Sequence, residues 1–244
     1  MINLQNLSTA TETLTLTAII DTALCVGAGG SSGSLADKPI VRTKDRKLLI
    51  PASQLKGRLR HECEKIARGL EWPICESPTA EKMCPQRKDL SDDFHIPQYD
   101  LTDWLQHQGY EGISENRKYH CLACQIFGNP MIPSRLDFSD LICSEPQENL
   151  PEVLRPGVTI NRRRQTAEDQ KLYFLETSPA SLKLAFIGTI QISPNAPSQT
   201  KPLILAALQH INALGGSKST GLGWLTWEIE PSEINNLEWD ELLK

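Results

Sequence analysis

The spacing of hydrophobic positions changes along the chain. Between residues 13 and 20 apolar and polar side chains alternate, which is typical of a half-buried strand. After Pro51 the apolar positions recur at helical spacing, and they are Leu55, Leu59, Cys63 and Ile66. We therefore expect a strand and then a helix, with Ser53 as its N-cap and Gly69 at its end.

The second half of the chain predicts a similar succession of elements. Two apolar segments, 158–160 and 172–175, bracket a polar stretch and predict a long hairpin. Alternation predicts a long strand over residues 182–192. A second helix follows, with Pro202 in its first turn and Gly215 at its end. A last strand, over 224–229, completes an α+β fold with helices on one face of an antiparallel sheet. A ferredoxin-like β-α-β-β-α-β core is compatible with this order.

Residues 70–130 show little periodicity and are interpreted as an insertion, with one short helix possible around residues 99–107. The chain has seven cysteines, and an odd number argues against a disulfide framework. Three of them are expected to be small buried hydrophobic residues: Cys25, Cys63 and Cys143.

The other four cysteines lie in the insertion. Cys121 and Cys124 have the spacing of a zinc knuckle, and Cys75 and Cys84 lie upstream. Metal binding would supply folding energy to a segment that lacks a core. We therefore expect a structural zinc site of four cysteines, with His120 as the main substitute ligand. Reduced, unpaired cysteines are the alternative.

Composition and charge narrow the class of protein. The net charge of −5 argues mildly against nucleic acid, but basic residues cluster, with Asp45 the only acid between residues 38 and 60. A second cluster occupies residues 162–164. Apolar runs are too short to span a bilayer, and the N-terminus does not resemble a signal peptide. We expect a soluble cytoplasmic protein with no membrane partner.

Two glycine-rich segments accompany the basic clusters. One covers residues 26–36, and the other runs from Gly215 to Gly223 and contains Lys218. Glycine permits positive φ angles and close approach of another backbone. The second segment follows a helix and precedes a strand, so it is not a dinucleotide-binding fingerprint. By itself, such a segment is equally well explained as a tight structural turn.

Four stretches of the chain form a recognisable combination: residues 26–42, IPASQLKGRLR at 50–60, CLACQIFG at 121–128 and the glycine turn at 215–223. This combination resembles the RAMP superfamily of CRISPR–Cas proteins, and within it the backbone subunit of type III effector complexes (the Csm-three type of the Cas-seven group). Residues 156–162 are also similar to the start of the family's thumb hairpin.

The resemblance implies a single RAMP domain over residues 1–244. It has a ferredoxin-like, RNA-recognition-like core, a zinc-binding insertion at 70–130 and a β-hairpin thumb at 155–176. It also implies three partners: a guide RNA, a single-stranded target RNA and other Cas subunits.

The resemblance further assigns residues to RNA. Basic and polar residues around the first helix, at the thumb tip and in the glycine turn would contact phosphates, which position RNA without reading its sequence. They are Arg42, Ser53, Gln54, Lys56, Arg58, Arg60, Arg162, Arg163, Gly216, Lys218 and Gly221. For the thumb arginines, a solvated hairpin is nearly as good an interpretation.

Asp37 is the candidate catalytic residue, because the family's catalytic aspartate lies in the corresponding loop. Its carboxylate would orient the 2′-hydroxyl of the target RNA or hold a magnesium ion. Attack of that hydroxyl on the adjacent phosphate would leave a cyclic phosphate. One alternative is a non-catalytic RNA-binding subunit. Another is a guide-processing endoribonuclease using His61, for which no second histidine or tyrosine is evidently placed.

Overall fold

A computed structural model describes residues 11–27, 36–72, 74–79, 82–84, 120–130, 132–180 and 182–231. Most of the expected insertion, including the possible helix around residues 99–107, lies outside the described residues. Within the described part of the chain, no helix combines the length and hydropathy needed to cross a bilayer.

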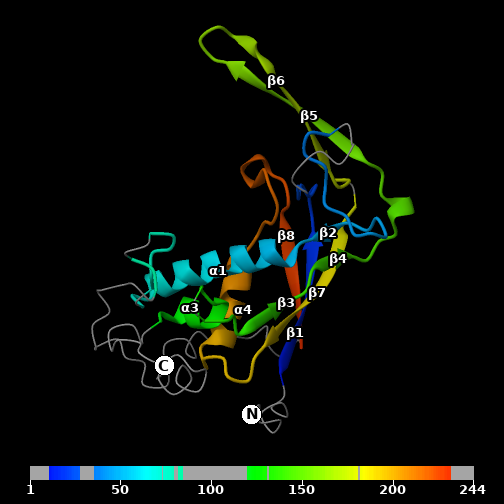
Figure 1. Cartoon of the computed structure of the whole chain (residues 1–244). Helices are drawn as coiled ribbons and strands as arrows, with labels where there is room; N and C mark the ends of the chain where they lie inside the picture. The colour runs from blue at the N-terminus through cyan, green and yellow to red at the C-terminus, as the bar shows by residue number, and fades with distance from the viewer. Residues whose placement is uncertain are drawn as a thin grey trace.

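An antiparallel sheet forms the centre of the protein (Figure 1). Its middle strand β1 (Glu12–Ile20) pairs along its whole length with β7 (Leu184–Ile192) and, on its other side, with β8 (Leu225–Glu230). The outer side of β7 pairs with two short strands, β3 (Leu136–Phe138) and β4 (Leu141–Cys143). Strand β2 (Leu49–Ile50) completes the order β2-β4-β7-β1-β8.

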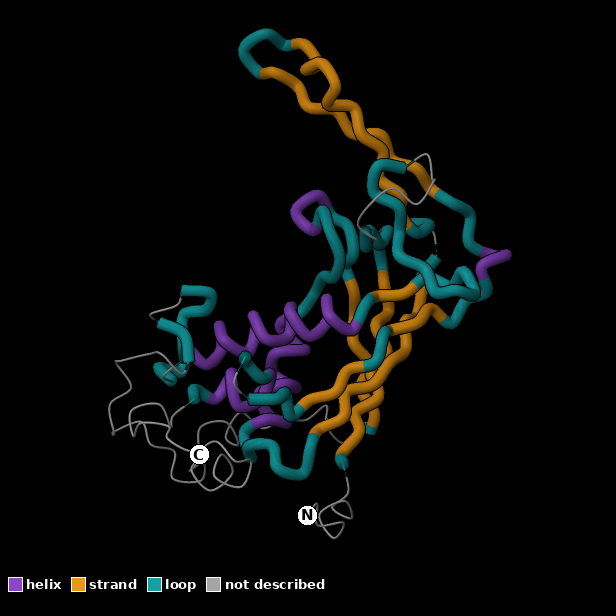
Figure 2. Tube along the Cα trace, in the orientation of Figure 1, coloured by secondary structure: helices purple, strands orange, loops and turns teal. Residues whose placement is uncertain are grey.

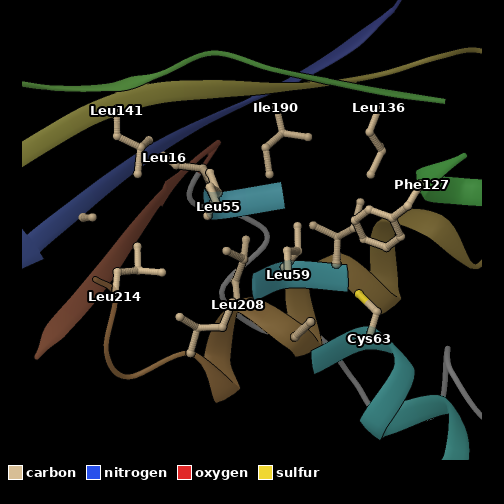
Figure 3. Close-up of a cluster of buried hydrophobic side chains, with 14 of the residues drawn as sticks. Leu16, Leu55, Leu59, Cys63, Phe127, Leu136, Leu141, Ile190, Leu208 and Leu214 are labelled. Atoms are coloured by element: carbon tan, nitrogen blue, oxygen red, sulfur yellow. The ribbon is translucent and has the colours of Figure 1, made fainter. Parts of the chain in front are cut away.

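Helices cover one face of this sheet, so the α+β prediction is confirmed (Figure 1). They are α1 (Ala52–Gly69), α3 (Leu122–Phe127) and α4 (Thr200–His210). The apolar stripe of α1 meets the inward side chains of the sheet and of α4, because burial of both surfaces removes them from water. Figure 3 shows this core, which includes Leu16, Leu55, Leu59, Cys63, Phe127, Leu136, Ile190 and Leu208.

A second, two-stranded sheet extends away from the main body (Figure 2). Strands β5 (Val153–Asn161) and β6 (Thr166–Thr177) form the hairpin that the sequence predicts. Their register shifts between Val158 and Ile160, and most of their side chains are exposed.

Three predicted element ends are wrong. Pro51, not Ser53, occupies the N-cap of α1. The N–H of Ala52, which has no partner within the helix, donates to Asp140 Oδ1 at 2.7 Å. A distant carboxylate therefore satisfies the helix start. Helix α4 ends at His210 rather than near Gly215, because Ile211 adopts an extended conformation. The long strand begins at Leu184, not at residue 182.

The glycine turn is held against the loop that follows β1 by main-chain hydrogen bonds. Leu214 N–H donates to Gly223 O at 2.9 Å, and Gly223 N–H donates to Ala23 O at 2.8 Å. Gly223 has a φ of +72°, and a Cβ built there would lie 1.8 Å from Leu214 O. Only glycine permits both this conformation and this approach.

We expect Gly223→Ala to lower the free energy of unfolding by more than about 2 kcal/mol, because steric clash adds to the cost of a left-handed alanine, about 1–2 kcal/mol. Gly221→Ala is the matched control, since Gly221 has a φ of +86° but a Cβ there meets nothing within 4 Å among the described residues. Urea denaturation measures both. Equal losses in the two variants would contradict the close approach of Leu214.

Candidate nucleic-acid interface and metal centre

Lys218 of the glycine turn interacts electrostatically with Arg58 of helix α1. Lys218 lies in a short 3₁₀ turn, Lys218–Thr220, flanked by left-handed Ser217 and Gly221. Burial and then the nearby positive charge of Arg58 lower the pKa of Lys218, while Glu62 acts in the opposite direction. The positive charge of Arg58 therefore acts on Lys218, although the two residues are 160 positions apart in sequence.

The face of α1 that carries Arg58 also carries polar atoms without partners. Gln54, Arg58 and Glu62 follow one another at intervals of four, so they line one side of the helix. Arg58 Nη2 lies 2.8 Å from Glu62 Oε1, and Glu62 is buried. Gln54 Oε1 and Arg58 Nε are buried and make no hydrogen bond within the described residues. A buried polar atom without a hydrogen bond destabilises the fold unless a ligand supplies the missing partner.

Gly57 lies on the exposed surface of this helix segment. A Cβ built at Gly57 meets nothing within 4 Å among the residues that the structure places. Close packing against the described part of the fold therefore does not explain a glycine in mid-helix. The exposed Ser53 lies one turn earlier on the same helix.

Lys56 and Arg60 lie on a different side of α1. The pKa of Lys56 is lowered by burial and then by Arg60, and is raised by Asp137 of β3. Arg60 donates through Nε to Glu64 at 2.9 Å and through Nη1 to Gly128 O at 2.9 Å. The three α1 cations that the sequence assigns to RNA, Lys56, Arg58 and Arg60, thus divide between two sides of the helix.

Four buried cysteines form a cluster beside α3. The Sγ atoms of Cys75, Cys84, Cys121 and Cys124 all lie within 4.8 Å of one another. The sulfurs of Cys75 and Cys124 are 3.6 Å apart, close to the roughly 3.8 Å expected for two thiolates that share a tetrahedral zinc ion. Hydrogen bonds from Cys121, Cys124 and Cys84 lower the pKa of the Cys75 thiol.

The donor set fits a soft divalent ion, since four closely spaced sulfurs are the ligands of closed structural zinc sites. His120, the expected substitute ligand, lies beside the cluster, but its Nδ1 is 2.8 Å from Asn129 Nδ2. The remaining three cysteines, Cys25, Cys63 and Cys143, are buried and uncrosslinked as expected.

Asp37 lies exposed at the base of the hairpin. Its Oδ2 accepts a hydrogen bond of 2.7 Å from Phe174 N–H of β6. Next to it, Lys38 forms a parallel bridge with Leu175, and Glu176 N–H donates to Lys38 O at 3.1 Å. The loop that carries the candidate catalytic residue is therefore fixed to the hairpin.

Glu176 secures this loop, and sequence reasoning missed it. Its buried carboxylate accepts Ile40 N–H at 2.9 Å and pairs with Arg42 at 2.6 Å. Arg42, assigned to RNA from sequence, is thus engaged inside the fold; the exposed Glu152 lies 3.9 Å from it. An acid at the end of a strand pattern gives no local signal of a partner 134 positions away.

The remaining assigned residues fall into two groups. Arg162 and Arg163 are exposed at the hairpin tip, where Asn161 Oδ1 accepts the main-chain N–H of Arg163 at 3.1 Å. The amides of Gly216 and Gly221 already donate inside the fold, to Cys25 O at 2.6 Å and to Lys218 O at 3.0 Å. In the turn, the Lys218 side chain is therefore the stronger candidate contact.

Comparison with known proteins identifies the family. Residues 17–226 match the RAMP superfamily, so the chain belongs to this superfamily of CRISPR-associated, RNA-binding proteins. No curated protein matches the sequence. Membership implies RNA and Cas-complex partners in general, and the superfamily includes some endoribonucleases.

Replacing Glu176 tests how the loop is held. We expect Glu176→Ala to lower the free energy of unfolding by about 3–5 kcal/mol, because Arg42 and the Ile40 amide lose a buried partner. Glu152→Ala removes an exposed carboxylate near the same arginine and should cost no more than about 1 kcal/mol. Urea denaturation compares the variants, and similar losses would show that burial of Glu176 has little energetic weight.

Proposed function

We propose that the chain is a guide-RNA-binding backbone subunit of a type III CRISPR effector complex, of the Csm-three type, and that it cleaves bound target RNA at Asp37. The observation that carries the proposal is the pair of buried α1 atoms without a hydrogen bond among the described residues, Gln54 Oε1 and Arg58 Nε. The charge of Arg58 also reaches Lys218 of the glycine turn, whose pKa it lowers. Two cations and a free acceptor in one place suit a phosphate and the ribose next to it.

The strand order supports a ferredoxin-like core for this subunit. In the order β4-β7-β1-β8 each pairing is antiparallel, and α1 and α4 follow the first and third strands of the motif. That is the arrangement expected of β-α-β-β-α-β. The whole described chain then forms one RAMP domain, with the segment at 70–130 as its insertion.

The hairpin β5–β6 supports the role of thumb. It extends from the body, and Val158, Ile160 and Leu172 are exposed on it while Arg162 and Arg163 lie at its tip. Apolar side chains can lie against unstacked bases, and arginines against phosphates. A hairpin of this composition suits displacement of a nucleotide from a guide–target duplex.

The position of Asp37 suits cleavage next to the displaced nucleotide. The Phe174 amide occupies Oδ2, so Oδ1 is the oxygen proposed to receive a 2′-hydroxyl or a hydrated magnesium ion. The 2′-oxygen attacks phosphorus as its proton passes to water, the bond from phosphorus to the 5′-oxygen breaks, and that oxygen takes up a proton from water. The products are a cyclic phosphate and a 5′-hydroxyl.

The cysteine cluster is proposed to hold one structural zinc ion. Zinc would supply folding energy to the insertion, to which Cys75 and Cys84 belong, and would fix α3 against α1. It takes no part in the proposed cleavage.

Substitution of Gly57 tests the proposed RNA face. Gly57→Ala should raise the free energy of unfolding of the free protein by about 1 kcal/mol, because alanine favours the helix. It should also weaken binding of a labelled single-stranded RNA of mixed sequence, because a methyl group then occupies the space proposed for the RNA backbone. Gly69→Ala is the control: it lies at the other end of α1 with equal room for a Cβ. Unchanged affinity in Gly57→Ala would contradict this RNA face.

Asp37→Asn tests cleavage separately from binding. The amide oxygen can still accept the Phe174 N–H while the charge is lost, so we expect RNA affinity to stay constant. Cleavage of matched target RNA by the assembled complex with magnesium should fall at least about a hundredfold. Asp45→Asn, in an exposed turn, is the control. Full cleavage in Asp37→Asn would overturn the catalytic assignment of Asp37.

A further inference from the structure

Arg60 directs its third hydrogen bond to a cysteine of the cluster. Its Nη2 lies 3.6 Å from Cys124 Sγ, within hydrogen-bond range for sulfur. With Glu64 on Nε and Gly128 O on Nη1, the guanidinium is held on three sides. Only about a quarter of its side chain is exposed.

The chemistry of the cluster gives this contact a purpose. Four thiolates around one divalent zinc ion leave an excess of negative charge in a buried site. Such charge is costly in a low-dielectric interior unless a donor or a cation lies next to it. A guanidinium N–H directed at a ligand sulfur supplies both, and partners of this kind orient ligands and tune metal affinity.

A second arginine of the same helix offers a comparison. Arg68 approaches the same carboxylate, Glu64, at 3.5 Å, and its Nη2 donates to the main-chain oxygen of Cys75 at 3.3 Å. Among the described contacts it reaches no cluster sulfur. Arg60 and Arg68 thus both pair with Glu64, but in the described part of the chain only Arg60 donates to a cluster sulfur, whereas Arg68 donates to a main-chain oxygen.

We propose that Arg60 is a positioning residue of the metal centre, donating to the Cys124 thiolate when zinc is bound, and that it does not contact the guide RNA. The inference rests on the proposed zinc site but not on the RNA-binding or cleavage proposals. It reassigns one of the three α1 cations that the sequence places on RNA. Helix α1 then serves the metal centre through Arg60 and carries the proposed RNA-binding residues Gln54 and Arg58 on another side.

The test compares Arg60→Met, Arg60→Lys and Arg68→Met with the parent protein. Metal analysis of the parent should give about one zinc per chain. Chelator competition should show zinc affinity about 10–100-fold lower in Arg60→Met. In cobalt-substituted protein, the sulfur-to-cobalt charge-transfer band should move to lower energy, because a thiolate without its donor is more easily oxidised. Arg68→Met should leave that band in place, and Arg60→Lys should fall between Arg60→Met and the parent.

RNA binding provides the second readout. The salt dependence of affinity for a mixed-sequence single-stranded RNA should be unchanged in Arg60→Met. In Lys218→Met its slope should fall by about 0.7, the value for one phosphate contact on a single strand. An unmoved cobalt band with full zinc affinity in Arg60→Met would overturn the role of Arg60, as would a reduced salt slope. A parent that binds neither zinc nor cobalt would overturn the metal site instead. If Arg60→Met does not fold, the band position in Arg60→Lys decides the question.

Discussion

The structure depends on the apolar face of strand β1. Leu14, Leu16, Ala18 and Ile20 are completely buried, and β1 is hydrogen-bonded on both sides. Because side chains alternate along a strand, this single register decides which face of β7 and β8 receives the helices. The helices can cover only that face, and their positions determine where Gln54 and Arg58 of α1 and the cysteine cluster lie. The candidate sites are therefore consequences of how one strand is paired.

Sequence periodicity predicted the elements that local pattern controls. The strand at residues 13–20 and the helix after Pro51 follow from spacing, and Gly69 marks the end of that helix. Two apolar segments around a polar stretch predicted the long hairpin. The ends of elements were predicted less well where distant groups decide them. Asp140 caps α1 across 88 positions, and the extended conformation at Ile211 ends α4 before the predicted glycine. The Asp140 partner of α1 is not visible in a local window of sequence.

The candidate site shows the same division. The cysteine spacing predicted a cluster that the structure brings together, because ligands of one ion must converge. The basic residues of α1 were harder to interpret. Residues two apart on a helix point to opposite sides, so Arg58 meets the glycine turn while Lys56 and Arg60 face elsewhere. The charged residues of α1 can be identified from the sequence, but only the packing of the helix decides what each of them faces.

The hairpin β5–β6 has a consequence for the energetics of assembly. A two-stranded ribbon with largely exposed side chains has no core of its own, and such ribbons are only marginally stable in water. Its base is fixed by the Lys38 bridge, whereas the tip is held by its own ladder and by Asn161 Oδ1, which accepts the main-chain N–H of Arg163 and of Arg164. A partner that binds the tip must order it. The conformational entropy lost in this step lowers the affinity per unit of buried area. Binding along the hairpin is therefore readily reversible until several contacts form together.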